Sequence, residues 1–127
     1  MKIGILSSGI LGYYVLNDLS KSYDFEFIAT NSKSIEIIKY SKKNNIPLFV
    51  GNPRKGRLYD FLKSKDCDVL LSINYLFLIE EDIIKFPKDY SINLHGSLLP
   101  KYRGRTPHVW AIINGEKQCG ISAHIID

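Results

Sequence analysis

The sequence predicts an α/β fold in which a mostly parallel sheet is flanked by helices. Short apolar runs with strand character alternate along the chain with segments in which apolar residues recur at helical spacing. One of these runs, at residues 68–73, has the composition of a strand that is buried on both faces. The 127 residues, 45% of them hydrophobic and 12% aromatic, suffice for a single domain with one ordinary core.

Two strand–helix units and a further strand are expected in the first 50 residues. An apolar run at 2–7 ends in Ser-Ser-Gly, and apolar residues then recur at helical spacing over 11–19. A second apolar run at 25–30 precedes a helical pattern over 35–45. Residues 47–50 are expected to form a short third strand.

The same alternation continues through the middle of the chain. Residues 58–64 fit a helix, 68–73 fit the next strand, and 80–85 fit a helical turn that Pro87 closes. The next strand is expected at 91–95. Because repeated strand–helix–strand units form parallel sheets with right-handed crossovers, we expect ligands to bind at the carboxyl ends of the strands.

The pattern changes after Pro100. A loop rich in Gly, Arg and Pro leads to a helix expected through 110–114, which stops at Gly115, and then to a strand expected at 120–126. The sequence ends inside or just after this strand without a polar tail, and native termini are seldom placed there. We therefore expect residues 1–127 to form one domain that is truncated at its C-terminal end.

The charge pattern argues against a dedicated nucleic-acid surface. The 17 basic residues exceed the 13 acidic residues by four, but the lysines are mostly scattered singly or in pairs. The one local concentration is Lys101, Arg103 and Arg105, in an expected loop. Such a cluster suits a small phosphorylated ligand better than a polyanion.

The two cysteines, Cys67 and Cys119, indicate a reducing compartment. They lack metal-ligand spacing and a surrounding disulfide framework, so both are expected to be buried or half-buried thiols. The N-terminal run MKIGILSSGILG is too short for a membrane span and lacks a signal-peptide cleavage site. We therefore expect a cytoplasmic protein that neither crosses a membrane nor requires a metal.

Gly9 and Gly12 follow the first expected strand and match part of a dinucleotide-binding fingerprint. The full pattern needs a third glycine and an acidic residue after the second strand, where this chain has Thr30 and Asn31. A turn that only glycine accommodates easily explains the same residues, and the sequence favours this interpretation over a nicotinamide cofactor.

Asn93 and His95 are candidate catalytic residues. They alternate along the run S-I-N-L-H-G-S, so on a strand both side chains project to one face while Leu94 points into the core. An amide that donates to an oxyanion, next to an imidazole that moves protons near neutral pH, suits acyl transfer to an amine. A hydrogen-bonded structural pair explains these two residues equally well when they are taken alone.

The longer segment NLHGSLLPKYRGRTPHVWAIINGE closely resembles the signature of the 10-formyltetrahydrofolate-dependent formyltransferases. That family includes enzymes that formylate methionyl-tRNA, glycinamide ribonucleotide and nucleotide-linked amino sugars. The resemblance implies a Rossmann-like formyltransferase domain that uses 10-formyltetrahydrofolate, with Asn93 and His95 as two of the three catalytic residues. The third is an aspartate a few residues beyond the segment H-I-I-D, and Asp127 does not match it. Residues 1–127 alone are therefore expected to be nearly inactive.

The segment DVLLSINYLFLI resembles the part of the family that receives the pterin ring of the folate, largely through backbone groups. Relatives often have Tyr-Gly where this chain has Tyr75-Leu76, and a proline where it has Glu80. An ordinary core position is the alternative for one or two of the residues Leu76, Phe77 and Leu78. The residues implied to bind the cofactor are Ile73, Asn74, Tyr75, Leu76, Phe77 and Leu78.

The loop R-G-R-T-P-H-V-W most resembles the family members that act on nucleotide-linked amino sugars. Guanidinium groups bind diphosphates through forked hydrogen bonds, and an aromatic side chain packs on a sugar or base. The residues implied to bind a dTDP- or UDP-linked amino sugar are Ser97, Arg103, Arg105 and Trp110. For Arg103 a loop-bracing role, and for Trp110 a core position, are the alternatives.

Two other functions also fit the sequence. One is methionyl-tRNA formyltransferase. Nucleic-acid binding is expected only in this case, with the tRNA as the acceptor. The other is a binding remnant that kept the fold and lost the chemistry with the third catalytic residue. The sequence does not define the oligomeric state, and a homodimer is one of the states that it allows.

Overall fold

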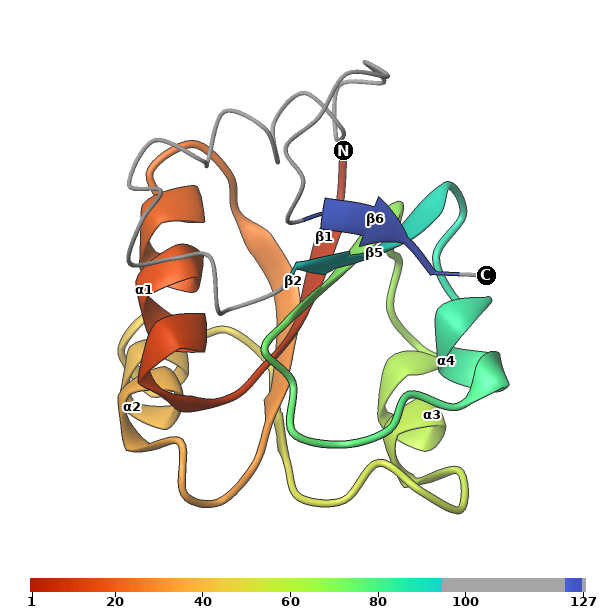
Figure 1. The fold of residues 1–127 in the computed structure, drawn as a ribbon, viewed down its shortest axis with the longest axis horizontal. Helices are drawn as coiled ribbons and strands as arrows, with labels where there is room; N and C mark the ends of the chain where they lie inside the picture. Colours follow the sequence, from red (N-terminus) through yellow and green to blue (C-terminus); the bar gives the residue numbers. More distant parts are fainter. Residues whose placement is uncertain (95–122, 127) are drawn as a thin grey trace.

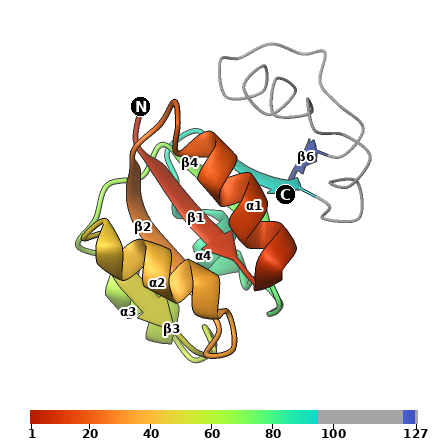
Figure 2. The same cartoon turned by 90° about the vertical axis from the view of Figure 1, so that its left-hand side faces the viewer.

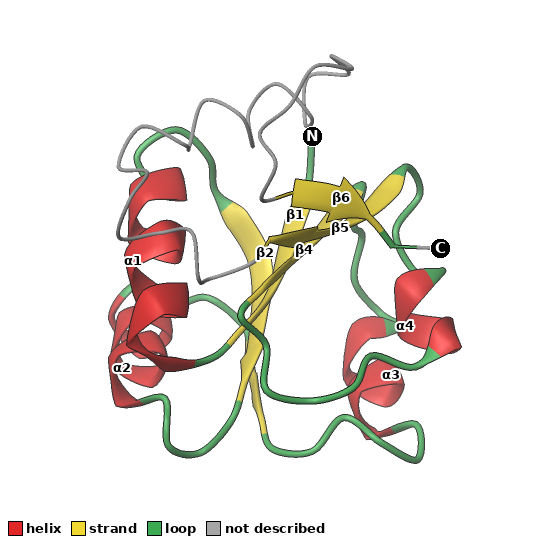
Figure 3. Ribbon diagram, in the orientation of Figure 1, coloured by secondary structure: helices red, strands yellow, loops and turns green. Residues whose placement is uncertain are grey.

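The computed structural model describes residues 1–94 and 123–126, which form a sheet with helices on both faces (Figure 1). Figure 3 shows the alternation of strands and helices along the chain. The strands are β1 (Ile3–Ser7), β2 (Phe25–Thr30), β3 (Leu48–Val50), β4 (Val69–Ile73), β5 (Tyr90–Leu94) and β6 (Ala123–Ile125). The helices are α1 (Gly9–Leu19), α2 (Ile35–Lys43), α3 (Arg57–Leu62) and α4 (Glu81–Ile84).

The described strands form one sheet in the order β3-β2-β1-β4-β5-β6. The first five strands are parallel, and β6 runs antiparallel to β5. The α/β fold and the mostly parallel sheet predicted from the sequence are therefore confirmed. The boundaries of β1 to β5 and of the four helices lie within two residues of the expected ones. The helix expected through 110–114 lies outside the described residues.

The apolar residues of the strands divide into two cores, one on each face of the sheet. Helices α1 and α2 cover one face and α3 and α4 the other, as the two views in Figures 1 and 2 show. On the first face Leu16, Ile37 and Ile5 belong to one core cluster, and all three are fully buried. On the second face Leu58 and Leu62 pack in a cluster with the fully buried Phe27. Burial of these apolar surfaces is the main force that holds the helices against the sheet.

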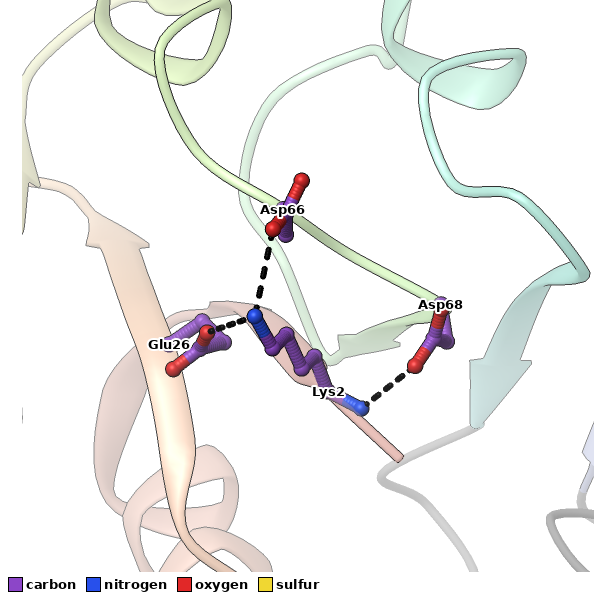
Figure 4. A network of polar contacts seen from close by, with 4 residues as sticks. All are labelled: Lys2, Glu26, Asp66 and Asp68. Atoms are coloured by element: carbon purple, nitrogen blue, oxygen red, sulfur yellow. Dashed lines mark hydrogen bonds and ion pairs between the residues drawn. The ribbon is translucent and has the colours of Figure 1, made fainter.

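A polar network ties together the amino ends of the three central strands (Figure 4). The Lys2 ammonium, just before β1, lies 3.1 Å from Asp66 Oδ2 and 3.9 Å from Glu26 Oε1. The Lys2 backbone amide donates to Asp68 Oδ2 at 2.8 Å. The hydrogen bond with Asp66 raises the pKa of Lys2 and lowers that of Asp66. These charges are exposed and lie at the edge of the sheet opposite the carboxyl ends of the strands, so their role is structural.

Cys67 is 2% exposed and belongs to the second core, as expected for a buried thiol. Its Sγ donates to the carbonyl of Val69 at 3.2 Å. Burial raises the pKa of the Cys67 thiol to about 12, so the group stays neutral at physiological pH. Cys119, the other expected thiol, lies outside the described residues.

Candidate active site

The carboxyl ends of β1, β4 and β5 meet at one edge of the sheet. Ser7 of β1 is opposite Ile73 of β4, and Ile73 is opposite Leu94 of β5. The chain runs outward from β1 to β2 and β3 on one side and continues through β4 and β5 on the other. The gap between β1 and β4 is therefore the topological switch point, where open parallel sheets bind ligands.

A hollow of about 390 Å³ lies at this switch point. It is bounded by segments that follow β1, β2 and β4, so three loops distant in sequence share it. Most of its lining residues have polar side chains, and one of them, Lys33, is a cation. The lining residues are Ser8, Gly9, Asn31, Lys33, Ser34, Asn74, Tyr75 and Leu76.

Gly9 adopts a positive φ of 74°, which lets the chain turn from β1 into α1. Its backbone amide donates to Ser34 Oγ at 2.9 Å, so this amide is already occupied by the protein. A Cβ on Gly12 would lie 2.2 Å from Ser7 Oγ, which shows how closely α1 packs on β1. Both glycines are thus required by the turn and the packing, in agreement with the turn interpretation of the sequence.

The segment 74–78 leaves β4 directly above the switch point and is anchored to the end of β1. Asn74 has a left-handed φ of 56°, and its Nδ2 donates to the Ser8 carbonyl at 3.3 Å. The Leu76 backbone amide donates to Ser8 Oγ at 3.0 Å. Ser7 Oγ donates to the Ile73 carbonyl at 2.9 Å. Two consecutive serines therefore hold the start of the segment that the sequence assigns to cofactor binding.

Side chains in this segment alternate between the protein and the solvent. Tyr75 and Phe77 are half-buried, and their ring centroids lie 5.5 Å apart in an edge-on arrangement. Leu76 is 65% exposed and Leu78 is 77% exposed. A core position is therefore wrong for Leu76 and Leu78. Leu76 lines the hollow, and Leu78 exposes further apolar surface two residues along the same loop.

Two residues of the predicted cofactor-binding set can contact a ligand through only some of their atoms. The Ile73 side chain is fully buried in the first core, so this residue reaches the edge through its backbone alone. The Tyr75 hydroxyl is buried and has no hydrogen-bond partner among the described residues. Burial raises the pKa of this phenol, which therefore stays protonated at neutral pH.

Asn93 is half-buried near the end of β5, beside Ser72 of β4. Its neighbours Ile92 and Leu94 point into the core formed with α1 and α2, so the Asn93 side chain projects to the opposite face. The alternation predicted for Asn93 and Leu94 is confirmed. His95, Ser97, Arg103, Arg105 and Trp110 lie outside the described residues, so their predicted roles stay predictions.

Two further observations on the described residues concern a metal site and a membrane span. No group of three or more His, Cys, Asp or Glu side chains within residues 1–94 and 123–126 is arranged to hold a metal ion. No helix in this part of the chain has the length and apolar character needed to cross a bilayer.

Ser8 is a site residue that the sequence did not single out. It was visible only as part of the Ser-Ser-Gly turn that ends the first strand. The relevant signal is its N-cap position before α1, where a serine hydroxyl normally bonds the first turn of its own helix. Here no such bond forms, and the hydroxyl is used by Leu76 instead.

Similarity to known proteins agrees with the resemblance seen in the motifs. Bifunctional polymyxin resistance protein ArnA of Wigglesworthia glossinidia brevipalpis is 40% identical over 115 residues, which cover 90% of this chain and 17% of that protein. A methionyl-tRNA formyltransferase of Thermodesulfovibrio yellowstonii is 40% identical over 100 residues, which cover 76% and 32%. A GDP-perosamine N-formyltransferase of Brucella melitensis is 40% identical over 83 residues, which cover 65% and 32%.

The fold has counterparts among solved structures. Phosphoribosylglycinamide formyltransferase from Streptococcus pneumoniae superposes with a TM-score of 0.64 at 16% identity, covering 99% of this chain and 73% of that one. The chain spans only 17 to 32% of the length of the three curated relatives described above. The formyl transferase family matches residues 13–127, nearly the whole sequence. On this match, and on the fold and motifs that agree with it, the chain belongs to the formyl transferase family.

Proposed function

We propose that this protein transfers a formyl group from 10-formyltetrahydrofolate to the amino group of a nucleotide-linked amino sugar. The observation that carries the proposal is the register of β4 and β5. Ile73 ends β4 opposite Leu94, which ends β5, so the segment 74–78 and the Asn-x-His motif, which begins at Asn93 of β5, start at the same edge of the sheet. A cofactor held by the first segment would therefore present its reactive end to the second.

The described part of the edge fits a folate. A pterin is a flat ring with hydrogen-bonding edges, and the backbone of 74–78 carries amide and carbonyl groups, other than the Leu76 amide that Ser8 already binds, beside a hollow of about 390 Å³. The exposed side chains of Leu76 and Leu78 supply apolar surface for the aromatic part of the molecule. The folate contributes an activated formyl group bonded to its N10 atom.

The chain's own residues have defined tasks in the proposed reaction. The acceptor amine attacks the formyl carbon, so a new carbon–nitrogen bond forms as the bond to N10 breaks. The Asn93 amide donates to the oxyanion that develops on the formyl oxygen. We assign to His95 the second donor and the transfer of the proton from the amine to the leaving N10 atom. The products are the formamide and tetrahydrofolate.

The acceptor class rests on the sequence segment that contains Arg103 and Arg105, together with a relative named for a nucleotide sugar, the GDP-perosamine N-formyltransferase. Two guanidinium groups suit a diphosphate, which a nucleotide-linked sugar carries. Methionyl-tRNA formyltransferase is the second candidate, because a relative of that name is also 40% identical.

An acceptor panel tests the proposal. The protein expressed from its complete gene is incubated with 10-formyltetrahydrofolate and with dTDP-, UDP- or GDP-linked amino sugars, or with methionyl-tRNA. Formation of the formamide is followed by mass spectrometry. Formylation of at least one sugar nucleotide is expected. Formylation of the tRNA alone would replace the proposal by the second candidate, and no formylation of any acceptor would favour a binding remnant.

Arg105→Ala in the same protein separates substrate binding from cofactor binding. The Michaelis constant for the sugar nucleotide is expected to rise, at a cost of roughly 1.5–3 kcal/mol per charged hydrogen bond, with little change for the folate. Arg54→Ala is the matched control, because Arg54 is an exposed arginine that follows β3, at the far end of the sheet from β5. An equal effect of both variants would refute a specific role for Arg105.

A further inference from the structure

The Ser8 hydroxyl is used in a way that its place in the sequence does not predict. Ser8 is the N-cap of α1, with an extended backbone at φ −141° and ψ 148°. A serine at this position normally accepts a hydrogen bond from an amide in the first turn of its helix. Ser8 makes no such capping bond, and its Oγ accepts instead from the Leu76 amide, 68 residues away.

The backbone of Ser8 supports the same loop. Its carbonyl accepts from Asn74 Nδ2 at 3.3 Å, so Ser8 contacts the loop through two separate groups. The two bonds bracket Tyr75, whose half-buried ring packs on the second core. Ser8 is 6% exposed, so water does not compete freely for these bonds.

Ser8 is itself held in place from the other side. The next residue, Gly9, donates its amide to Ser34 Oγ, and Ser34 Oγ in turn donates to Asn31 Oδ1. A Cβ on Gly9 would lie 3.7 Å from Asn74 Nδ2, so the two loops are in close contact. The segment 74–78 is thus hydrogen-bonded to Ser8, and the residue after Ser8 is in turn hydrogen-bonded to Ser34, which follows β2.

We infer that Ser8 is a positioning residue that holds the backbone of 74–78 in the conformation that receives the pterin ring. The inference rests on the proposed function, because it takes that segment as the folate site. Without the hydroxyl, the Leu76 amide loses its partner and the exposed loop is free to turn. Folate binding then has to order the loop, which lowers affinity without changing the chemical step.

The test compares three variants in the protein expressed from its complete gene. Ser8→Ala is expected to raise the dissociation constant of 5-formyltetrahydrofolate about tenfold and to raise the Michaelis constant for the cofactor, with kcat at saturation nearly unchanged. Ser8→Thr keeps the hydroxyl, suits the extended backbone and is expected to restore binding. Ser41→Ala removes another buried serine, whose Oγ donates to the Ile37 carbonyl in α2, and is expected to leave the folate constants unchanged.

Hydrogen exchange at the Leu76 amide, without ligand, is the direct readout of the anchor. This amide is expected to be protected in the unaltered protein and in Ser8→Thr, and to exchange faster in Ser8→Ala. If Ser8→Ala does not fold, Asn74→Gly removes the other bond while it tolerates the left-handed backbone, and it is expected to weaken folate binding in the same way.

Unchanged folate affinity in a folded Ser8→Ala protein, or in Asn74→Gly, would overturn the inference and leave the proposed function intact. Equal loss of affinity in Ser41→Ala would also overturn it, because the effect would then reflect general destabilisation. Absence of folate binding in the unaltered protein would overturn both the inference and the proposed function.

Discussion

Ile73 and Leu94 are opposed residues on neighbouring parallel strands, and both side chains are buried in the same core. Their burial fixes the register of β4 against β5, since a slip by one residue would turn each apolar side chain to the wrong face. The carboxyl ends of β4 and β5 are therefore held one strand spacing apart, about 4.8 Å. The proposed formyl transfer relies on this relationship, because the segment 74–78 follows β4 and Asn93 lies near the end of β5.

Asn93→Ala is expected to lower kcat about 10²–10³-fold, because in the proposed mechanism the amide donates to the oxyanion of the transition state. The dissociation constant of 5-formyltetrahydrofolate and the thermal midpoint should change little, since Asn93 is half-buried and its apolar neighbours remain. Steady-state kinetics with saturating substrates measure the effect. Asn17→Ala, an exposed residue of α1, is the control, and turnover like that of the control would exclude Asn93 from the mechanism.

Gly12→Ala is expected to lower the free energy of unfolding by about 1–3 kcal/mol, because the added Cβ has no room. It would lie 2.2 Å from Ser7 Oγ and 3.1 Å from the Ile73 carbonyl oxygen. Urea denaturation measures the loss. The same substitution should cost less in a Ser7→Ala background, where the nearest atom is gone. An equal cost in both backgrounds would contradict the packing described between α1 and β1.

Asp66→Asn is expected to lower the thermal midpoint at pH 7 in low salt. The hydrogen bond with the Lys2 ammonium lowers the pKa of Asp66. The ionised Asp66 carboxylate therefore contributes to stability above the ordinary carboxylate pKa, and this contribution is lost as pH falls through the lowered pKa. The raised pKa of Lys2 keeps that partner charged up to at least its ordinary value of 10.5. The contribution should therefore span the neutral range and vanish in strong acid and in 1 M salt.

The control for this substitution is Asp89→Asn, which removes an exposed carboxylate outside the network of Figure 4. Thermal scans of both variants at pH 7 and in strong acid separate the effects. A loss at pH 7 that is the same for both variants would show that net charge, and not the Lys2 network, is responsible.

Much of the fold follows from the sequence because local pattern and burial agree. The run at Phe25–Thr30 is apolar and bounded by polar residues, and the strand has the same limits. The continuous apolar character of Val69–Ile73 predicts a strand buried on both faces, and all five residues are buried. The direction of β6 could not be predicted in this way, because strand composition does not distinguish parallel from antiparallel pairing.

The site was predicted less completely, because its key contacts join residues far apart in sequence. The alternation around Asn93 indicated which side chains of this strand point away from the core. Nothing local indicated that the Ser8 hydroxyl would serve Leu76 instead of its own helix. The left-handed turn at Asn74 was also missed, although asparagine tolerates this conformation better than most residues.

The most direct test of the account is a crystal structure of the protein expressed from its complete gene, with 5-formyltetrahydrofolate bound. The pterin ring is expected to lie against the backbone of 74–78, with Leu76 and Leu78 along its apolar side. The end of the folate that carries the formyl group should point toward Asn93. A pterin bound elsewhere, or a formyl-bearing end directed away from the end of β5, would contradict the account.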